Sequence, residues 1–505
     1  MEFHGTLTGT LAPGPTCFID SLQALRKKGI MNVLIICTNQ SAFPMPVMPI
    51  GACMVAEAAE RAGHRVSVLD LMFEHDPARA IASAIRRSSP DVIGLSVRNI
   101  DNNDMRGPAF FIPGLLPLIK TIRSLTEAPI VLGGAALTVM PEEILRYTGT
   151  SLAVLGDGEV TFPLLLERLS RGEPFDDLPG IALLLAGEFQ ANPPASTGSS
   201  NDCMAPYYQQ WIDVRSYRSQ LSTAPLQTKL GCQFQCSYCT YRKIEGSTYR
   251  FSDPLQVAEA AARLASSGLR DIEFVDSVFN APYDHAMAVC EALTRSRTRA
   301  RFQSLELNPI CFDDALLTAM EQAGFVGIGL TVESASDEVL QGLRKGFTAG
   351  HVHAAAEIVR RHHLPCVWIF LLGGPGETEG TVRETLRFAE TAIRPQDAVF
   401  FNIGIRVYPG TGLESIARKQ GLLSLPSSEM LAPVFYVSPD VDVSRISQLV
   451  KNSMDRHMNF MSGDSLNFRF LPAIHRAGYW LGLRSPLWKH TRFIRRGLRF
   501  AGMDV

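Results

Sequence analysis

Short apolar runs alternate with helical patterns over the first third of the chain. The first run, at 33–37, is continuous and leads through a proline-rich loop into a helical pattern at 51–62. A continuous apolar run of this length is expected of a strand that is covered on both faces. Further strands are predicted at 65–69, 92–97, 130–132 and 152–155, and further helices at 77–88, 111–126, 141–147 and 161–169. Strands that alternate with helices predict a Rossmann-like, doubly wound parallel sheet over residues 31–190.

A second alternating series begins near residue 226. Its strands are predicted at 226–229, 271–275, 301–306, 326–332, 366–371 and 402–407, with helices such as 254–267, 312–323, 336–343, 350–362 and 380–392 between them. Six strand–helix units predict an α/β partial (β/α)6 barrel over residues 223–425. The polar stretch 192–202 places a linker at 191–222. Residues 1–30 are expected to form an extension, and 426–505 a small, mainly helical region that does not continue the barrel pattern.

Composition narrows the class of protein without naming a function. The chain has 505 residues, 46% of them hydrophobic and 19% charged, and a net charge of −2. This length favours several domains, and the near-neutral charge gives no sign of nucleic-acid binding. No basic region followed by an apolar stretch opens the chain, and no apolar run approaches the roughly 20 residues that span a bilayer. We therefore expect a cytoplasmic protein.

Three of the ten cysteines are clustered, and the other seven read as buried small hydrophobic residues. Cys232, Cys236 and Cys239 have the spacing C-x3-C-x2-C and follow the first predicted barrel strand. Three thiolates on one loop can hold three irons of a [4Fe–4S] cluster and leave the fourth iron open to another ligand. The alternative is a zinc site, which requires a fourth ligand; Cys203 and His285 are the nearest candidates and are distant in sequence.

The cysteine loop, with Tyr238 before its last cysteine, resembles the cluster motif of the radical S-adenosylmethionine (SAM) superfamily. Segments 274–280 (FVDSVFN), 329–334 (GLTVES), 369–378 (IFLLGGPGET) and 408–413 (YPGTGL) resemble that family's later strand motifs in the same order. The second of its motifs lacks the glycine-glycine-glutamate form here. The resemblance implies SAM-binding roles for Tyr238, Asp276, Ser277, Glu333, Ser334, Gly373, Gly374 and Tyr408.

The N-terminal region resembles the cobalamin-binding domain that precedes many radical SAM cores. The resemblance rests on segments 49–51 (PIG), 92–96 (VIGLS), 132–134 (LGG) and 155–159 (LGDGE). The D-x-H-x-x-G motif is absent, and neither His64 nor His75 lies in one, which implies a cobalamin without a histidine beneath its cobalt. The alternative is a Rossmann-like domain that binds no cobalamin. The resemblance implies cobalamin-binding roles for Pro49, Gly51, Ser96, Arg98, Asn99, Gly133, Gly134, Gly156, Gly158 and Glu159.

Together the resemblances imply an enzyme that cleaves SAM to a 5′-deoxyadenosyl radical and methylates an unactivated carbon. The implied substrate is a small molecule, a natural-product intermediate or a lipid, and the implied partner is a one-electron donor such as a flavodoxin or ferredoxin. Glu306 and Asn308 are further candidates to face the barrel interior. Three alternatives stay open: a cyclisation or rearrangement with the same cofactors, a radical enzyme without cobalamin, and a non-catalytic cobalamin-binding sensor or carrier.

The last thirty residues are basic, with aromatic residues interleaved. They contain Arg476, Arg484, Lys489, Arg492, Arg495, Arg496 and Arg499. One interpretation is a solvated pair of packed helices. The other is a surface that receives an anionic or lipid-like substrate or makes peripheral contact with a membrane.

Overall fold

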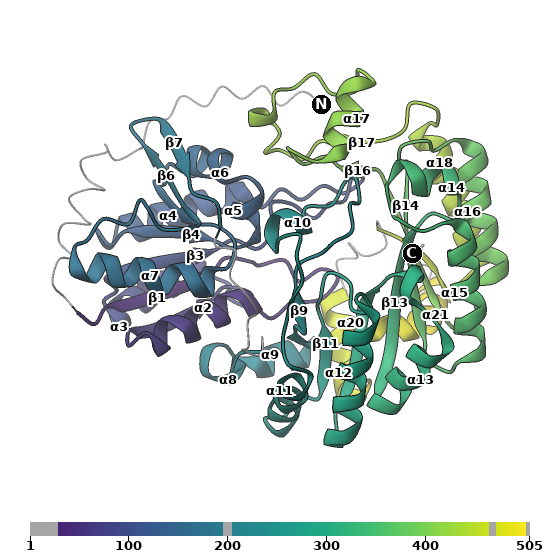
Figure 1. Ribbon diagram of the computed structural model, residues 1–505, viewed down its shortest axis with the longest axis horizontal. Helices are drawn as coiled ribbons and strands as arrows, with labels where there is room; N and C mark the ends of the chain where they lie inside the picture. The colour runs from purple at the N-terminus through teal and green to yellow at the C-terminus, as the bar shows by residue number, and fades with distance from the viewer. Residues whose placement is uncertain (1–28, 195–204, 464–470, 501–505) are drawn as a thin grey trace. The chain divides into compact units, whose positions relative to one another are not determined.

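The computed structural model describes residues 29–194, 205–463 and 471–500 (Figure 1). The expected N-terminal extension therefore lies almost entirely outside the described residues, as does Cys203. The chain divides into two compact units. Unit 1 comprises Met1–Asn39, Val55–Ile100 and Phe111–Ala195, and unit 2 comprises Gln40–Met54, Asp101–Phe110 and Ser196–Val505. Two short segments inside the predicted first domain thus fold as part of the second unit.

Unit 1 contains the five parallel strands that the sequence predicts. They are β1 (Asn32–Cys37), β2 (Arg65–Asp70), β3 (Val92–Ser96), β4 (Ile130–Gly133) and β5 (Leu152–Val154). The hairpin of β6 (Ile181–Leu185) and β7 (Glu188–Ala191) adds two antiparallel strands beside β5, in the order β2-β1-β3-β4-β5-β6-β7. The hairpin turn has Ala186 at φ 51° and Gly187 at φ 87°, as a two-residue turn between twisted strands requires.

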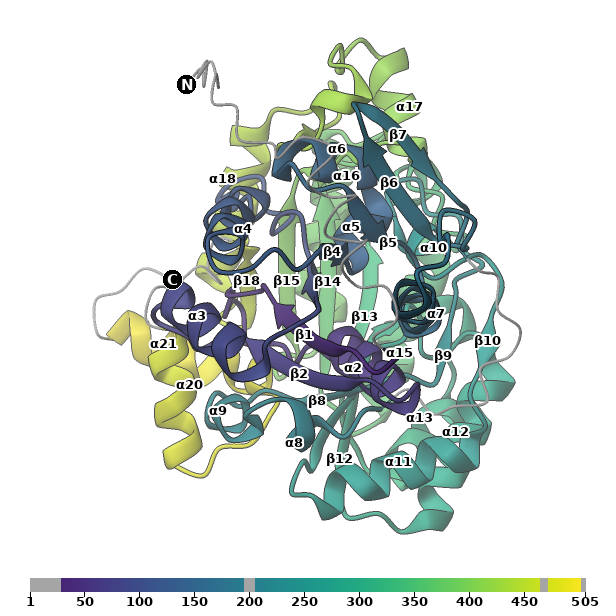
Figure 2. The same ribbon diagram turned by 90° about the vertical axis from the view of Figure 1, so that its left-hand side faces the viewer.

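Helices cover both faces of the unit 1 sheet. On one face α3 (Pro77–Ser88), α4 (Leu115–Arg123) and α6 (Pro141–Thr148) pack in succession, and on the other α2 (Ile50–Arg61) contacts α7 (Gly158–Arg171) through Val55 and Gly158 (Figure 2). The short helices η1 (Ile112–Gly114) and α5 (Ala135–Val139) complete the unit. Strand order reverses between β1 and β3, and ligands of such sheets bind beyond the carboxyl ends of the strands at this reversal.

Unit 2 is built on a sheet of seven parallel strands. In spatial order these are β18 (Phe460–Ser462), β15 (Ala398–Ile403), β14 (Cys366–Leu372), β13 (Phe325–Glu333), β12 (Arg301–Leu307), β11 (Asp271–Phe274) and β8 (Ala224–Leu226). Six correspond to predicted strands, but β8 and β15 begin two and four residues before the predicted 226–229 and 402–407. β18 lies in the region expected not to continue the barrel pattern, yet it pairs in parallel with β15. Because β8 and β18 do not pair with each other, the barrel is partial.

Two antiparallel ribbons extend from the strand ends of unit 2. They are β9 (Lys229–Leu230) with β10 (Arg250–Phe251), and β16 (Ile405–Arg406) with β17 (Phe435–Tyr436). The first ribbon leads into and out of the cysteine loop, so backbone pairing fixes both ends of that loop.

Helices line the outer face of the barrel sheet. They are α11 (Pro254–Ser266), α12 (Tyr283–Ser296), α13 (Asp314–Ala323), α14 (Asp337–Gly342), α15 (Ala349–Arg361), α16 (Glu379–Ala392) and α18 (Val443–Arg456) (Figure 1). The helices α11, α12 and α13 pack in succession, as do α15, α16 and α18. Outward aromatic side chains fill the layer between, as where Trp368 and Phe370 meet Phe388 of α16 edge to face. The shorter helices are α8 (Tyr208–Trp211), α9 (Val214–Ser219), α10 (Tyr241–Ile244), α17 (Gly412–Lys419), η2 (Pro309–Cys311) and η3 (Ser427–Glu429).

The C-terminal segment packs against the barrel sheet. It forms α20 (Leu471–Trp480), η4 (Leu487–His490) and α21 (Thr491–Phe500). Trp488 packs on the cluster of Val367, Ala398 and Met461, and a Cβ added to Gly327 would lie 2.8 Å from its ring. Gly327 therefore leaves room for the indole on the sheet. No helix among the described residues is long and apolar enough to cross a membrane.

Candidate active site

The three clustered cysteines lie on one tight loop between β9 and α10. Gly231 opens the loop at φ 92°, and a side chain there would overlap the carbonyl of Thr248. The Cys232 amide donates to the carbonyl of Gly246 at 3.1 Å, and the Cys239 amide donates to the carbonyl of Cys236 at 3.3 Å. This backbone geometry requires glycine at 231 and turns all three cysteines onto one short arc.

Ser237 connects the cysteine loop to two distant motifs. Its amide donates to the carbonyl of Leu343 at 2.9 Å, and its carbonyl accepts the Leu413 amide at 2.7 Å. A Cβ on Gly412 would lie 3.3–3.4 Å from Ser237. The segments that follow β13 and β16 therefore brace the loop directly, which is a physical reason for their fixed order behind the cysteines.

The three thiols are free, and none forms a disulfide. Burial raises the pKa of Cys239 to about 12, and the neighbouring Cys236 and Cys232 add to the shift. Burial likewise raises the pKa of Cys236, against the lowering effect of Lys345. In the described part of the chain no three His, Cys, Asp or Glu side chains are grouped to hold a single metal ion. A cluster of irons spreads over more space than one ion, with one thiolate for each of three irons.

Glu333 is at the centre of a buried charged group beside the cysteines. Tyr238 donates its hydroxyl to Glu333 Oε1, and Lys345 Nζ lies 2.9 Å from the same oxygen. Burial lowers the pKa of Lys345, but the charge of Glu333 reverses this and raises it above its usual value. The second oxygen, Oε2, is buried and has no hydrogen-bond partner among the described residues. A buried carboxylate oxygen without a donor indicates a bound group that supplies one.

The backbone at Glu333 supports the same conclusion. Its φ of 60° lies in the left-handed region, which is uncommon for a residue other than glycine. The neighbouring Ser334 is fully buried and hydrogen-bonds Thr385 at 3.1 Å. Strained backbone of this kind, held by packed surroundings, is concentrated at ligand-binding sites.

The predicted SAM ligands after β11 are engaged with protein groups. Asp276 accepts from the Thr228 amide at 2.7 Å and from the Thr228 hydroxyl at 2.6 Å, and Lys229 Nζ lies 3.1 Å away. Ser277 donates to Glu245, and burial raises the pKa of that carboxyl group to about 7. The contact of Asp276 and Ser277 with SAM stays a prediction.

The remaining SAM candidates lie in turns after β14 and β16. Gly373 has φ 94° and donates its amide to Glu377 at 3.1 Å, and Gly374 packs on Leu343. Tyr408 donates its hydroxyl to Asn103 at 2.8 Å. The glycines thus shape the turn behind the cysteine loop, whereas Tyr408 contacts a segment that the sequence assigned to the first domain.

Glu306 faces the barrel interior, and Asn308 has a structural role. Burial raises the pKa of Glu306 to about 8, and the charge of Glu333 adds to the shift. Asn308 accepts the Ile310 amide at 3.0 Å with its side chain, and it pairs with Asn280 through its backbone. Asn308 therefore caps η2.

Sequence reasoning did not select Glu245, Lys229 or Lys345 as site residues. Lys345 lies 12 residues after Glu333 in the chain, and Lys229 lies 47 residues before Asp276. The position of Lys345 shortly after the motif at 329–334 was the available signal; for Glu245 and Lys229 no local pattern gives one.

The cobalamin candidates of unit 1 gather at the carboxyl ends of three adjacent strands. Ser96, Arg98 and Asn99 end and follow β3, Gly133 and Gly134 end and follow β4, and Gly156, Gly158 and Glu159 follow β5. Gly134 has φ 99°, and a Cβ there would lie 2.5 Å from the carbonyl of Val97. Ligands of doubly wound sheets bind beyond this edge, where the strand order reverses. The contact of these residues with cobalamin stays a prediction. Pro49 and Gly51, at the start of α2, belong to unit 2.

A cleft of about 410 Å³ reaches the cysteine loop. Its lining includes Cys236 and Cys239 and the basic side chains of Arg242, Lys243 and Arg344. All three basic residues are exposed. Positive charge at the entrance to a redox centre favours approach of an acidic partner.

Two family models match the chain. Residues 41–166 match the B12 binding domain, and residues 227–389 match the radical SAM superfamily. The second match begins just before the cysteine loop and ends in α16.

Among curated proteins, the tryptophan 2-C-methyltransferase of Streptomyces laurentii is 24% identical, over 76% of this chain and 74% of the relative. The hopanoid C-3 methylase of Methylococcus capsulatus is 28% identical, over 62% of this chain and 58% of the relative. Among solved structures, the radical SAM methyltransferase TsrM from Kitasatospora setae, determined with cobalamin and a [4Fe–4S] cluster, superposes with a TM-score of 0.80 at 23% identity. That match covers 93% of this chain and 99% of TsrM and shows that the fold is shared.

The fold and the cysteine loop define a radical SAM protein with an N-terminal B12-binding domain. The chain is a cobalamin-dependent radical SAM enzyme whose cofactors are a [4Fe–4S] cluster, SAM and cobalamin. The described residues fit these groups. Three free thiols share one loop, Glu333 offers beside them a buried oxygen without a hydrogen-bond partner among the described residues, and glycines gather at the carboxyl ends of the unit 1 strands.

Proposed function

We propose that this enzyme methylates an unactivated carbon of a small-molecule, natural-product or lipid substrate. The observation that carries the proposal is a three-cysteine loop, open at one iron, in the same chain as a B12-binding domain. Two of the curated relatives are named as carbon methyltransferases, of tryptophan and of a hopanoid. When bound, the cluster, SAM and cobalamin supply the electron, the adenosyl radical and the transferable methyl group.

In this proposal the chain's own residues bind and orient these groups. Cys232, Cys236 and Cys239 hold the cluster, and Glu333 accepts a hydrogen bond from SAM through its free Oε2. Lys345 orients the Glu333 carboxyl group through the 2.9 Å contact. The protonated Glu306 carboxyl group, with its raised pKa, can donate to a substrate or SAM oxygen inside the barrel.

Cofactor content of the anaerobically purified protein tests the first half of the proposal. We expect about four irons per chain and one equivalent of cobalamin. Cys236→Ala should remove the iron and abolish SAM cleavage while cobalamin remains bound to the first domain. Cys290→Ala, which removes a buried thiol of α12, serves as the matched control and should retain both. Four irons without cobalamin would remove the proposed methyl carrier.

A substrate-free assay separates methyl transfer from the alternatives. The enzyme with reduced cobalamin is mixed with SAM, and S-adenosylhomocysteine and 5′-deoxyadenosine are quantified. A methyltransferase forms S-adenosylhomocysteine because a second SAM reloads the cobalamin. A cyclase or rearrangement enzyme forms 5′-deoxyadenosine alone, and a sensor or carrier forms neither.

The proposal includes an acidic one-electron donor such as a flavodoxin or ferredoxin. Arg242, Lys243 and Arg344 line the cleft that reaches Cys236 and Cys239, and they give it a positive entrance. Arg242→Glu combined with Arg344→Glu should slow reduction by flavodoxin but leave reduction by dithionite unchanged. Equal slowing by both reductants would contradict donor docking at this cleft.

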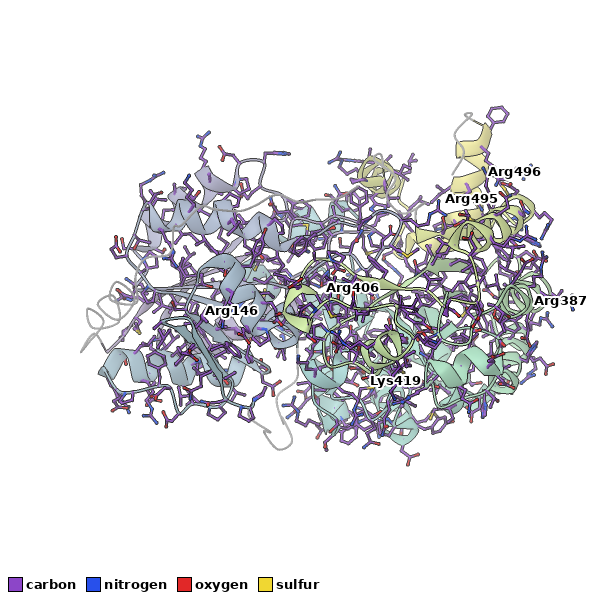
Figure 3. The ribbon with its side chains drawn as sticks, turned by 90° about the horizontal axis from the view of Figure 1, so that it is seen from above. Arg146, Arg387, Arg406, Lys419, Arg495 and Arg496 are labelled. Carbon is purple, nitrogen blue, oxygen red and sulfur yellow. The ribbon has the colours of Figure 1, made fainter. Side chains whose placement is uncertain are left out.

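We also propose that α21 contacts an anionic membrane. Phe493 and Phe500 are 72% and 96% exposed. Arg492 and Arg496 are also exposed and lie four residues apart, on one face of the helix; Figure 3 labels Arg496. Exposed aromatic rings beside arginine suit an anionic lipid interface. Phe493→Ser with Phe500→Ser should reduce sedimentation with phosphatidylserine-containing vesicles. Leu255→Ser, at a 56% exposed position of α11, should not.

A further inference from the structure

The loop that follows β3 is anchored inside unit 2. The chain leaves unit 1 after Ile100 and returns at Phe111, and the residues between belong to unit 2. The loop is braced by its own polar groups: Asn102 donates to the carbonyl of Gly107 at 2.8 Å and accepts the Ala109 amide at 2.9 Å. Its ends are joined by an antiparallel bridge between Asp101 and Phe110. The loop therefore has a defined conformation that its internal hydrogen bonds stabilise.

A buried ion pair is the main anchor of this loop. Arg406 Nε donates to Asp101 Oδ2 at 2.8 Å, and the two side chains are 2% and 0% exposed. The remaining guanidinium nitrogens donate to the carbonyls of Val407 at 2.6 Å and Met430 at 2.9 Å. Arginine offers its donors in a rigid planar fork, so engaging them all fixes its orientation and that of its carboxylate partner.

Two further contacts hold the same loop against the β15–β16 connection. The Arg406 guanidinium lies 4.6 Å from the centre of the Tyr408 ring, and the Tyr408 hydroxyl donates to Asn103 at 2.8 Å. Gly404 has φ 79°, and a side chain there would overlap Met105. Gly404 therefore packs against Met105, Arg406 binds Asp101, and Tyr408 binds Asn103. We name this set of six residues the loop clasp.

We propose that Arg406 is a positioning residue for cobalamin, acting through the loop clasp. Arg98 and Asn99, the expected cobalamin contacts, are three and two residues before Asp101, so anchoring Asp101 restricts where they point. The proposal rests on the proposed function, because it assumes that cobalamin is bound beyond β3. Arg406 itself needs no contact with cobalamin, SAM or the cluster.

The test compares variants of the intact holoenzyme purified without oxygen. Arg406→Met removes the guanidinium group with all its hydrogen bonds, whereas Asp101→Asn removes only the negative charge of the carboxylate. The milder Asp101→Asn variant is used if Arg406→Met does not fold. Arg445→Met is the matched control, because Arg445 pairs with Glu379 at 2.8 Å on the exposed surface. Three quantities are measured: the rate at which cobalamin dissociates, S-adenosylhomocysteine formed with saturating cobalamin, and 5′-deoxyadenosine formed from SAM and dithionite.

We expect Arg406→Met to release cobalamin about tenfold faster and to form S-adenosylhomocysteine about tenfold more slowly, the factor expected for a lost charged hydrogen bond. Formation of 5′-deoxyadenosine should stay within about twofold of wild type. A parallel fall of 5′-deoxyadenosine would show a general structural role, and unchanged cobalamin release would show that the clasp does not position cobalamin; either result overturns the inference. If the wild type forms no S-adenosylhomocysteine, the proposed function fails, and the cobalamin dissociation rate still decides the role of Arg406.

Discussion

The buried pair of Lys229 and Asp276 gives the sharpest prediction. Their side chains are 1% and 0% exposed, and the charged atoms lie 3.1 Å apart. Both oxygens of Asp276 are occupied, Oδ1 by the backbone amides of Thr228 and Lys229 and Oδ2 by the Thr228 hydroxyl and the Lys229 ammonium. A carboxylate with four donors has no free lone pair for the amino group of SAM. We therefore expect Asp276 to connect β8 to β11 and to contribute mainly to stability.

Asp276→Ala should destabilise unit 2 by about 3–5 kcal/mol, because it leaves the Lys229 ammonium buried with one carbonyl partner, that of Phe279. Replacing both charges, as Lys229→Met with Asp276→Leu, removes the unpaired ion and takes the Asp276 acceptor from the Thr228 donors and the backbone amide of residue 229, at a cost of about 1–3 kcal/mol. The double variant should thus be more stable than Asp276→Ala by about 2 kcal/mol.

The assay is the shift of the urea unfolding midpoint of the anaerobic holoenzyme, followed by SAM binding at a urea concentration where each variant is folded. Arg361→Met, at an exposed ion pair with Asp314, serves as the control and should shift the midpoint little. A double variant as unstable as Asp276→Ala would refute the stability argument. A folded double variant that no longer binds SAM would instead establish Asp276 as a SAM ligand.

Three further outcomes are expected. Glu333→Gln should weaken equilibrium binding of SAM about tenfold or more, because a charged acceptor becomes neutral; equal affinity would contradict the role of Oε2. Gly329→Ala should lower the stability of unit 2 by about 1–3 kcal/mol in urea, because its Cβ would lie 2.5 Å from the Leu305 carbonyl. Burial lowers the pKa of His475 from 6.5 to about 4, so the folded protein binds fewer protons than the unfolded chain between those values and loses stability as the pH falls. His475→Gln should remove this loss, about 2 kcal/mol near pH 5, when unfolding midpoints at pH 5 and 7 are compared.

Local information in the sequence was enough for most of the regular structure. The five parallel strands of unit 1 and six of the seven barrel strands follow from apolar runs of strand length between helical patterns. The cysteine loop was equally readable, because its three residues lie within eight positions and their spacing alone limits the chemistry. Both signals are short-range, so neither depends on how distant segments meet.

The structural features that the sequence did not predict have a common physical cause. β7 (EFQA) and β18 (FMS) are short edge strands whose stability comes from the strand beside them, and their own patterns are weak. β6 (IALLL) is a continuous apolar run that was not assigned as a strand. The assignment of 40–54 and 101–110 to unit 2 likewise could not be read from the sequence, because both segments follow predicted strands of the first domain. Asp276 matched a family motif by position, but its hydrogen-bond partners became visible only in the folded barrel.

By itself the sequence predicted the three-cysteine loop and the two strand–helix series, because cluster ligation and sheet formation are encoded in contiguous residues, and its resemblances implied a radical SAM enzyme with a B12-binding domain. Only the tertiary structure decided how charges separated in the chain meet: Glu333 with Lys345 and Tyr238, Asp276 with Lys229, and Asp101 with Arg406, which are 305 residues apart. A buried charge must find a partner, but a linear pattern does not say which one. That choice is made by the packing that brings the partners out of water together.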